Sequence, residues 1–134
     1  MCFCVRDAVA TRGQYLALSK ASLMISCVLS VHAEIREYCN IEKFNASCVD
    51  SGAGSLIVMD YAYYGRQRVG RCVRDLGRAG KCGVDVLAVT DSRCSGRRTC
   101  TIRLPDDQMY AMNACRESVS HLYAAYSCVT GNER

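Results

Sequence analysis

The chain has 134 residues, of which 22% are charged and 50% hydrophobic, and its formal net charge is +4. This composition and length indicate one folded domain and exclude a disordered chain. The eleven cysteines reach the density typical of disulfide scaffolds in small exported proteins. With no tryptophan and only two phenylalanines, the eight tyrosines supply most of the aromatic surface.

The first feature along the chain is an apolar run over residues 23–31, which Lys20 precedes and Val31-His32-Ala33 follows. Positive charge, an apolar run too short to span a bilayer and a small-residue end are typical of a signal peptide. Cleavage after Ala33 would remove Cys2, Cys4 and Cys27 and leave an even number of cysteines, eight. We therefore predict a leader at 1–33 and a secreted or ectodomain portion at 34–134. About twenty residues are long for the segment before an apolar run, so a mis-assigned start or an internal segment is the alternative.

Beyond the leader, residues 35–38 precede a polar stretch between Cys39 and Cys48, and Asp50-Ser51-Gly52-Ala53-Gly54 is a turn signal. The polar stretch contains Asn45-Ala46-Ser47, a glycosylation sequon if the chain is exported. Residues 55–64 are rich in β-branched and aromatic side chains and stop at Gly65, which predicts a strand buried on at least one face.

Glycines break up the basic stretch 66–81, which predicts a loop there. Asp85 is placed to cap a short helix that runs to about Cys94. Alternation over 99–104 predicts a strand, 105–107 is a turn signal, and 122–129 predicts a closing strand. The pattern therefore predicts a small α+β, disulfide-rich domain of short antiparallel strands with one short helix.

The cysteines and histidines indicate neither a metal site nor an active site. In 34–134 the shortest gap between cysteines is the five residues between Cys94 and Cys100, whereas structural zinc sites place ligands in closer pairs. The only histidines are His32 and His121, and paired cysteines would leave no thiol for a Cys-His nucleophile. Asp106-Asp107 lies in a turn signal and suits turn chemistry better than acid/base work. We expect no enzyme, no cofactor and no metal.

Five residues inside the eight-cysteine frame carry a family resemblance. Ala62-Tyr63-Tyr64-Gly65-Arg66, followed by Cys72, resembles the A-x-Y-G-R motif of the SUEL-type galactose/rhamnose-binding lectin domain, named for sea urchin egg lectin and also found in latrophilin receptors. The match spans residues 39–128 and includes the element 92–100 and the closing Tyr126-Ser127-Cys128. The resemblance implies the SUEL-type lectin fold and the disulfides Cys39–Cys72, Cys48–Cys128, Cys82–Cys115 and Cys94–Cys100.

The resemblance also implies a sugar site, and this chain departs from the family at most of its positions. The aromatic position is kept as Tyr64. Asn40 stands where the family has an acid, and Asn113-Ala114-Cys115 replaces Asp-Pro-Cys. Glu117 and Ser120 stand where the family has a glycine and a lysine. The expected carbohydrate site is therefore Tyr64, Asn40, Asn113, Glu117 and Ser120.

These features favour a binding function outside the cell. We expect galactosides, rhamnosides or other cell-surface glycans as partners, and no nucleic acid and no transmembrane segment. An extracellular receptor or adhesion partner is the alternative if the substituted site has lost sugar binding. A third mode would use basic residues to hold sulfated glycans, through Arg68 and Arg71 of the first basic stretch. A second basic stretch consists of Arg93, Arg97, Arg98 and Arg103.

Overall fold

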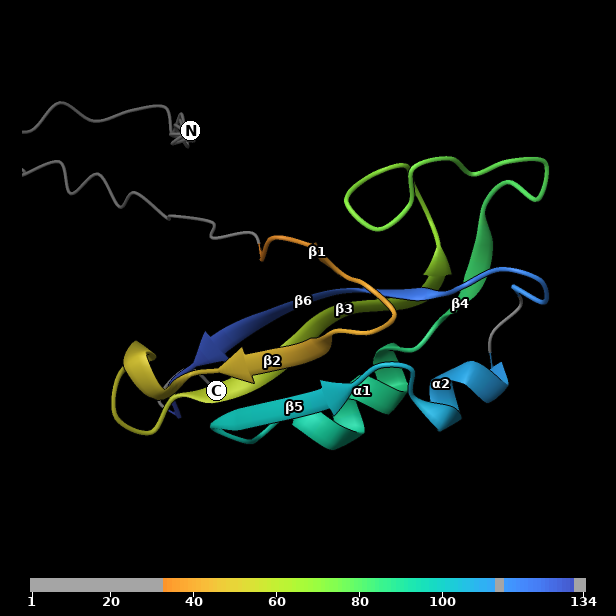
Figure 1. Ribbon diagram of the computed structural model, residues 1–134. Helices are drawn as coiled ribbons and strands as arrows, with labels where there is room; N and C mark the ends of the chain where they lie inside the picture. Colours follow the sequence, from red (N-terminus) through yellow and green to blue (C-terminus); the bar gives the residue numbers. More distant parts are fainter. Residues whose placement is uncertain (1–32, 113–114, 132–134) are drawn as a thin grey trace, which may run out of the picture. The chain divides into compact units, whose positions relative to one another are not determined.

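Several strands of this domain follow the alternation of buried and exposed side chains along the sequence. The computed structural model describes residues 33–112 and 115–131, which belong to one compact unit, Ala33–Arg134 (Figure 1). Residues 1–32 of the predicted leader, which include its three cysteines, lie outside the described residues. The elements, in chain order, are β1 Arg36–Tyr38, β2 Lys43–Ser47, the 3-10 turn η1 Val49–Ser51, β3 Leu56–Arg66, β4 Cys82–Asp85, α1 Leu87–Cys94, β5 Thr99–Arg103, α2 Asp107–Met112 and β6 His121–Val129.

The strands form two antiparallel sheets. The larger sheet has the order β1-β6-β3-β4, and the smaller one pairs β2 with β5. β3 and β6 form the longest ladder, from Leu56 opposite Val129 to Gly65 opposite His121, with a bulge between Met59 and Tyr61. The β2–β5 ribbon runs alongside the β3–β6 ladder (Figure 1).

The core lies between the two sheets and α1. One buried cluster includes Phe44 of β2, Ile102 of β5, Ile57 of β3, Leu122 of β6 and Val89 of α1. Each strand contributes alternate residues to this cluster, as the period of two along a strand requires. The opposite side chains of β2 and β5 consequently face away from the core and form the outer face of the β2–β5 ribbon.

Four disulfides connect different segments of the described chain, with sequence separations from 6 to 80. The longest loop is closed between the end of β2 and the end of β6, with a sequence separation of 80. The shortest joins the end of α1 to β5, with a separation of 6. The pairing implied by the family resemblance is confirmed, because the four bridges are Cys39–Cys72, Cys48–Cys128, Cys82–Cys115 and Cys94–Cys100.

The predicted strands and helix are confirmed over most of their length. β3, β5 and β6 occupy the three predicted strand segments, and the stretch from 67 to 81 is a loop. α1 ends at Cys94 as predicted, and the Asp85 carboxylate accepts the N–H of Leu87 at 2.8 Å. Strand β3 continues through Gly65 because Gly65 packs directly against the backbone of β4. A Cβ at Gly65 would lie 2.3 Å from the Cys82 carbonyl oxygen.

The prediction of a single helix is wrong. Residues 105–107 do not form a simple turn, because α2 begins at Asp107. The Asp106 carboxylate accepts the N–H of Met109 at 3.1 Å, which is the hydrogen bond of a helix N-cap. Aspartate favours turns and helix starts for the same reason, namely that its short carboxylate accepts nearby backbone N–H groups. The aspartates at 106 and 107 therefore do mark a change in the chain direction, but the change is the start of a helix and not a simple turn.

Candidate functional site

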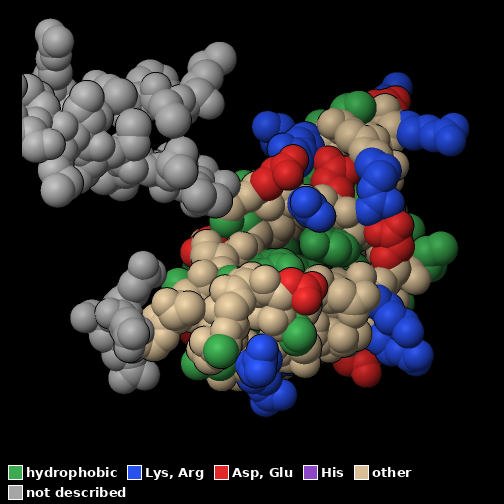
Figure 2. All heavy atoms as spheres, turned by 90° about the vertical axis from the view of Figure 1, so that its left-hand side faces the viewer, with side chains coloured by type: hydrophobic (Ala, Val, Ile, Leu, Met, Phe, Trp, Pro, Cys, Tyr) green, Lys and Arg blue, Asp and Glu red, His purple; other side chains and the backbone are tan. Residues whose placement is uncertain are grey.

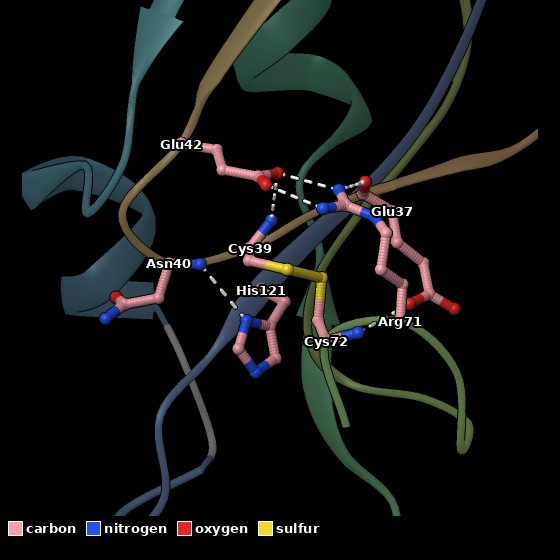
Figure 3. Close-up of polar contacts among 7 residues, drawn as sticks. All are labelled: Glu37, Cys39, Asn40, Glu42, Arg71, Cys72 and His121. Carbon is pink, nitrogen blue, oxygen red and sulfur yellow. Dashed lines mark hydrogen bonds and ion pairs between the residues drawn. A yellow bond between two sulfur atoms is a disulfide. The ribbon is translucent and has the colours of Figure 1, made fainter. Parts of the chain in front are cut away.

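The fold brings most of the expected sugar-site residues to one end of the larger sheet. Asn40 follows β1, and Ser120 immediately precedes β6. The backbone N–H of Asn40 donates a hydrogen bond to Nδ1 of His121 at 3.1 Å, across 81 positions of sequence (Figure 3). Tyr64 lies in the same sheet, opposite Leu122. Asn113 lies outside the described residues.

Exposure divides the expected residues into two groups. Tyr64 is 1% exposed and belongs to the core cluster, and Ser120 is 4% exposed. Burial raises the pKa of the Tyr64 hydroxyl. A tyrosine so deeply packed presents no ring face to a sugar in this structure. Asn40 is half-buried and Glu117 is exposed, so these two offer polar groups to solvent.

His121 is the residue at this end of the sheet that the sequence did not single out. Its side chain is 6% exposed, and its Nδ1 accepts the Asn40 N–H, so the neutral ring carries its proton on Nε2. Burial lowers the pKa of His121, the positive charge of Arg66 lowers it further, and the carboxylates of Glu37 and Glu42 oppose that effect. His121 is therefore a packed side chain in this structure.

The one cluster of metal-type ligands found among the described residues is His121 with Cys39 and Cys72, whose ligand atoms lie within 4.8 Å of one another. Both sulfurs belong to the Cys39–Cys72 disulfide. A disulfide sulfur is not the thiolate that binds metal ions, so this trio does not form a metal site while the bridge is intact.

An ion-pair cluster supports the other side of the Cys39–Cys72 bridge (Figure 3). The Arg71 guanidinium binds both carboxylate oxygens of Glu42, at 2.6 and 2.7 Å, and also donates to the Glu37 carbonyl. The Cys39 N–H donates to the same Glu42 carboxylate at 2.9 Å. The hydrogen bonds from Arg71 and from the Cys39 N–H lower the pKa of Glu42 to about 2. These contacts fix the turn that carries Asn40.

The 67–81 loop is held against the larger sheet by Glu37. The Glu37 carboxylate accepts hydrogen bonds from Arg68 and from the Cys72 N–H, both at 3.1 Å. The Arg68 guanidinium also lies 5.9 Å from the ring centre of Tyr123, within range of a cation–π contact. Over the upper part of the face drawn in Figure 2, acidic side chains lie among the Lys and Arg side chains.

This loop changes the prediction for the first basic stretch. Arg68 and Arg71 were the residues expected to hold sulfated glycans, and the structure pairs them with Glu37 and Glu42 respectively. Their charge is therefore largely compensated within the domain. A shallow groove of about 720 Å³ follows this cluster along β1 and β2, with Tyr38 in its lining.

The predicted glycosylation site, Asn45, also lines this groove. Asn45 is exposed on β2, and the Thr101 hydroxyl donates to its side-chain oxygen at 2.8 Å. This hydrogen bond leaves the amide nitrogen of Asn45, the atom that carries an N-linked glycan, directed elsewhere. Glycosylation at Asn45 stays a prediction.

Comparison with models of known protein families finds no match for this chain, and comparison with curated proteins finds none either. Four disulfides fit an extracellular location. Within residues 33–112 and 115–131, no helix has the length and apolar character needed to cross a membrane.

Proposed function

We propose that this chain is a carbohydrate-binding domain of galactose/rhamnose type in an extracellular protein, and that it binds rather than catalyses. The observation that carries the proposal is the disulfide frame. Its four bridges pair the cysteines as the SUEL-type resemblance implies, and the Asn40 N–H, next to the Cys39–Cys72 bridge, donates to His121 at the start of β6. The sugar would lie at this end of the larger sheet, against Asn40 and Glu117.

The side chains at this end suit hydrogen bonding to the uncharged hydroxyl groups of a sugar. The Asn40 amide, which points away from His121 in Figure 3, offers two donors and an acceptor, and Glu117 offers a carboxylate. Because Tyr64 is buried, it offers no ring face to the sugar, and binding to Asn40 and Glu117 depends on few hydrogen bonds. Each bond to a charged group contributes about 1.5–3 kcal/mol, so a monosaccharide is expected to bind with a Kd on the order of millimolar.

Titration of the folded protein with methyl galactosides and rhamnosides, followed by amide chemical shifts in NMR, tests the proposal. Glu117→Gln is expected to weaken binding, and Asn40→Asp, which restores the acid of the family pattern, is expected to tighten it about tenfold. Arg78→Ala, an exposed change in the 67–81 loop, is the control and should leave the affinity unchanged. The absence of shifts around Asn40 in both the natural chain and Asn40→Asp would refute a sugar site here.

A second candidate function is an adhesion or receptor module that binds another protein at the same end of the domain. Two large apolar side chains are exposed there: Ile41, 87% exposed, follows Asn40, and Val119, 52% exposed, precedes Ser120. Exposed apolar residues next to half-buried polar ones are typical of a protein interface. Capture of one defined extracellular partner, lost in Ile41→Asp and insensitive to galactose and rhamnose, would favour this function over the first.

A further inference from the structure

The outer face of the β2–β5 ribbon is polar throughout and carries its positive charge at both ends. The six outward side chains are all exposed, and the register pairs them across the two strands. The pairs are Lys43 opposite Arg103, Asn45 opposite Thr101, and Ser47 opposite Thr99.

The Lys43–Arg103 pair is unfavourable within the domain itself. Two like charges directly opposite each other on one face of an antiparallel ladder repel. At the other end of β5, Arg97 and Arg98 are also exposed. In the described part of the chain, none of these four cations takes part in an ion pair. Arg68, Arg71 and Arg93, in contrast, are each paired with an acid.

A groove follows this face along β5. It has a volume of about 790 Å³, and Arg97, Thr99, Thr101 and Arg103 contribute to its lining. The acids of the same groove are Asp106, which binds Arg93 at 2.6 Å, and Asp107 in the first turn of α2. Among the described residues that line this groove, Asp107 is therefore the one acid without an ion pair, whereas two cations without an ion pair, Arg97 and Arg103, line it as well.

The arrangement of charge and hydroxyl groups selects the class of ligand. Arg97 and Arg103 are six positions apart, which corresponds to roughly 20 Å along an extended strand. Cations that far apart suit a chain with repeated negative charges better than a single phosphate. Between them, Asn45, Ser47, Thr99 and Thr101 present amide and hydroxyl groups that match sugar hydroxyls. The face holds no aromatic ring for stacking nucleic-acid bases and no large apolar side chain for entering a membrane.

We propose that the outer face of β2–β5 binds a sulfated polysaccharide of the glycosaminoglycan class, through Lys43, Arg97, Arg98 and Arg103. The proposed site uses neither Asn40 nor Glu117, although Lys43 and Asn45 also line the groove that contains Glu42. The proposal therefore holds whether or not the end of the larger sheet binds galactosides or rhamnosides. Asn45 lies at the middle of the face, so an N-linked glycan at Asn45 would cover it. Modification at Asn45 and binding of the polysaccharide therefore exclude each other.

Heparin affinity of the full chain tests the proposal with two triple variants of equal net charge. Lys43→Ala/Arg97→Ala/Arg103→Ala removes three cations of the face, and the control Arg74→Ala/Arg78→Ala/Lys81→Ala removes three exposed cations of the 67–81 loop. The face variant is expected to lose at least tenfold in affinity at physiological salt and to show a shallower dependence on salt. The control should change less than twofold. Retained disulfides and an unchanged melting temperature establish that both variants are folded.

Three results would overturn the proposal. One is an equal loss in the two triple variants, which would make net charge the cause. Another is binding of DNA or anionic vesicles as tight as that of heparin, or full competition by desulfated heparin. The third result concerns protein that carries a glycan on Asn45, as established by mass spectrometry. This glycosylated protein should bind heparin more weakly than Asn45→Gln does. Equal affinity of the two would show that heparin does not bind to this face.

Discussion

The disulfides allow a quantitative test of how the frame stabilises the domain. We expect Cys48→Ala/Cys128→Ala to lose more stability than Cys94→Ala/Cys100→Ala. The physical reason is that a bridge lowers the entropy of the unfolded chain in proportion to the logarithm of the loop that it closes. The sequence separations are 80 and 6, while Cys48 and Cys94 are both 0% exposed, so the cost of packing an alanine is similar at the two sites.

The loop lengths give the size of the difference. In the chain-entropy model a loop of 80 residues corresponds to about 4.5 kcal/mol at 25 °C, and one of 6 residues to about 2.2 kcal/mol. The other bridges shorten the path between Cys48 and Cys128 in the unfolded chain. A route through Cys39–Cys72 and Cys82–Cys115 is roughly 35 residues long, which lowers the first figure to about 3.8 kcal/mol. The long bridge should therefore exceed the short one by about 1.5–2 kcal/mol.

Urea unfolding of both double variants measures this difference, with tyrosine fluorescence as the probe. The free energy of unfolding comes from the midpoint and the slope, and a thiol count confirms that the remaining three bridges are intact. Each kcal/mol corresponds to roughly 4–8 °C in melting temperature for a domain of this size, so calorimetry provides a second measurement. Equal losses in the two variants, or a larger loss for the short bridge, would refute the entropic account.

Three further perturbations test individual contacts. Gly65→Ala is expected to destabilise the domain by about 2–3 kcal/mol because its Cβ would meet the β4 backbone, whereas the control Gly131→Ala, where a Cβ meets nothing within 4 Å and the backbone has no positive φ, should change stability by about 0.5 kcal/mol or less in urea melts. The buried His121 has a pKa below its ordinary 6.5, so the unfolded chain takes up a proton first and stability should fall as the pH drops below 6.5. His121→Asn should remove that part of the pH dependence, and an unchanged profile would contradict the assignment. Glu42→Gln should cost about 1 kcal/mol at neutral pH, a value kept small because the Glu42 side chain is 37% exposed. Since the Glu42 carboxyl has a pKa of about 2 in the folded state and 4.5 ordinarily, the stability difference between the natural chain and Glu42→Gln should be full above pH 4.5 and vanish towards pH 2.

The sequence predicted those parts of the fold that depend on local pattern. β3 and β6 are long runs of β-branched, aromatic and small side chains, and Asp85, the residue before the N-cap Val86, accepts the N–H of the first residue of α1, so the local pattern was sufficient. β2 was missed because only Phe44 and Ala46 face inward, and a five-residue strand with polar outer residues resembles a loop. α2 was missed because Asp106 signals a turn and a helix start equally.

The candidate site was less predictable because it depends on contacts far apart in the sequence. Asn40, Tyr64 and Ser120 lie at one end of the larger sheet, but the family resemblance that suggested them carried no information on their burial in this chain. The burial of Tyr64 and the hydrogen bond between Asn40 and His121 result from packing across 81 positions. The compensation of Arg68 and Arg71 by acids of β1 and the following turn was equally hidden, because charge counted along the chain does not show which residues meet.

The disulfide frame of this domain and its candidate binding residues are subject to different structural requirements. Four bridges in the described chain and the close backbone approach at Gly65 determine how the strands are arranged, and neither depends on the identity of the residues at positions 40 and 117. Those positions can therefore change without loss of the fold, which is why a scaffold alone does not define a ligand. The same separation allows the exposed face of β2–β5 to acquire cations that repel one another, because the bridge between Cys48 and Cys128 holds the end of β2 irrespective of that repulsion. An anionic ligand would relieve the repulsion between Lys43 and Arg103, and this relief would add to its binding free energy. The Lys43–Arg103 pair is therefore the most informative place to look for a partner.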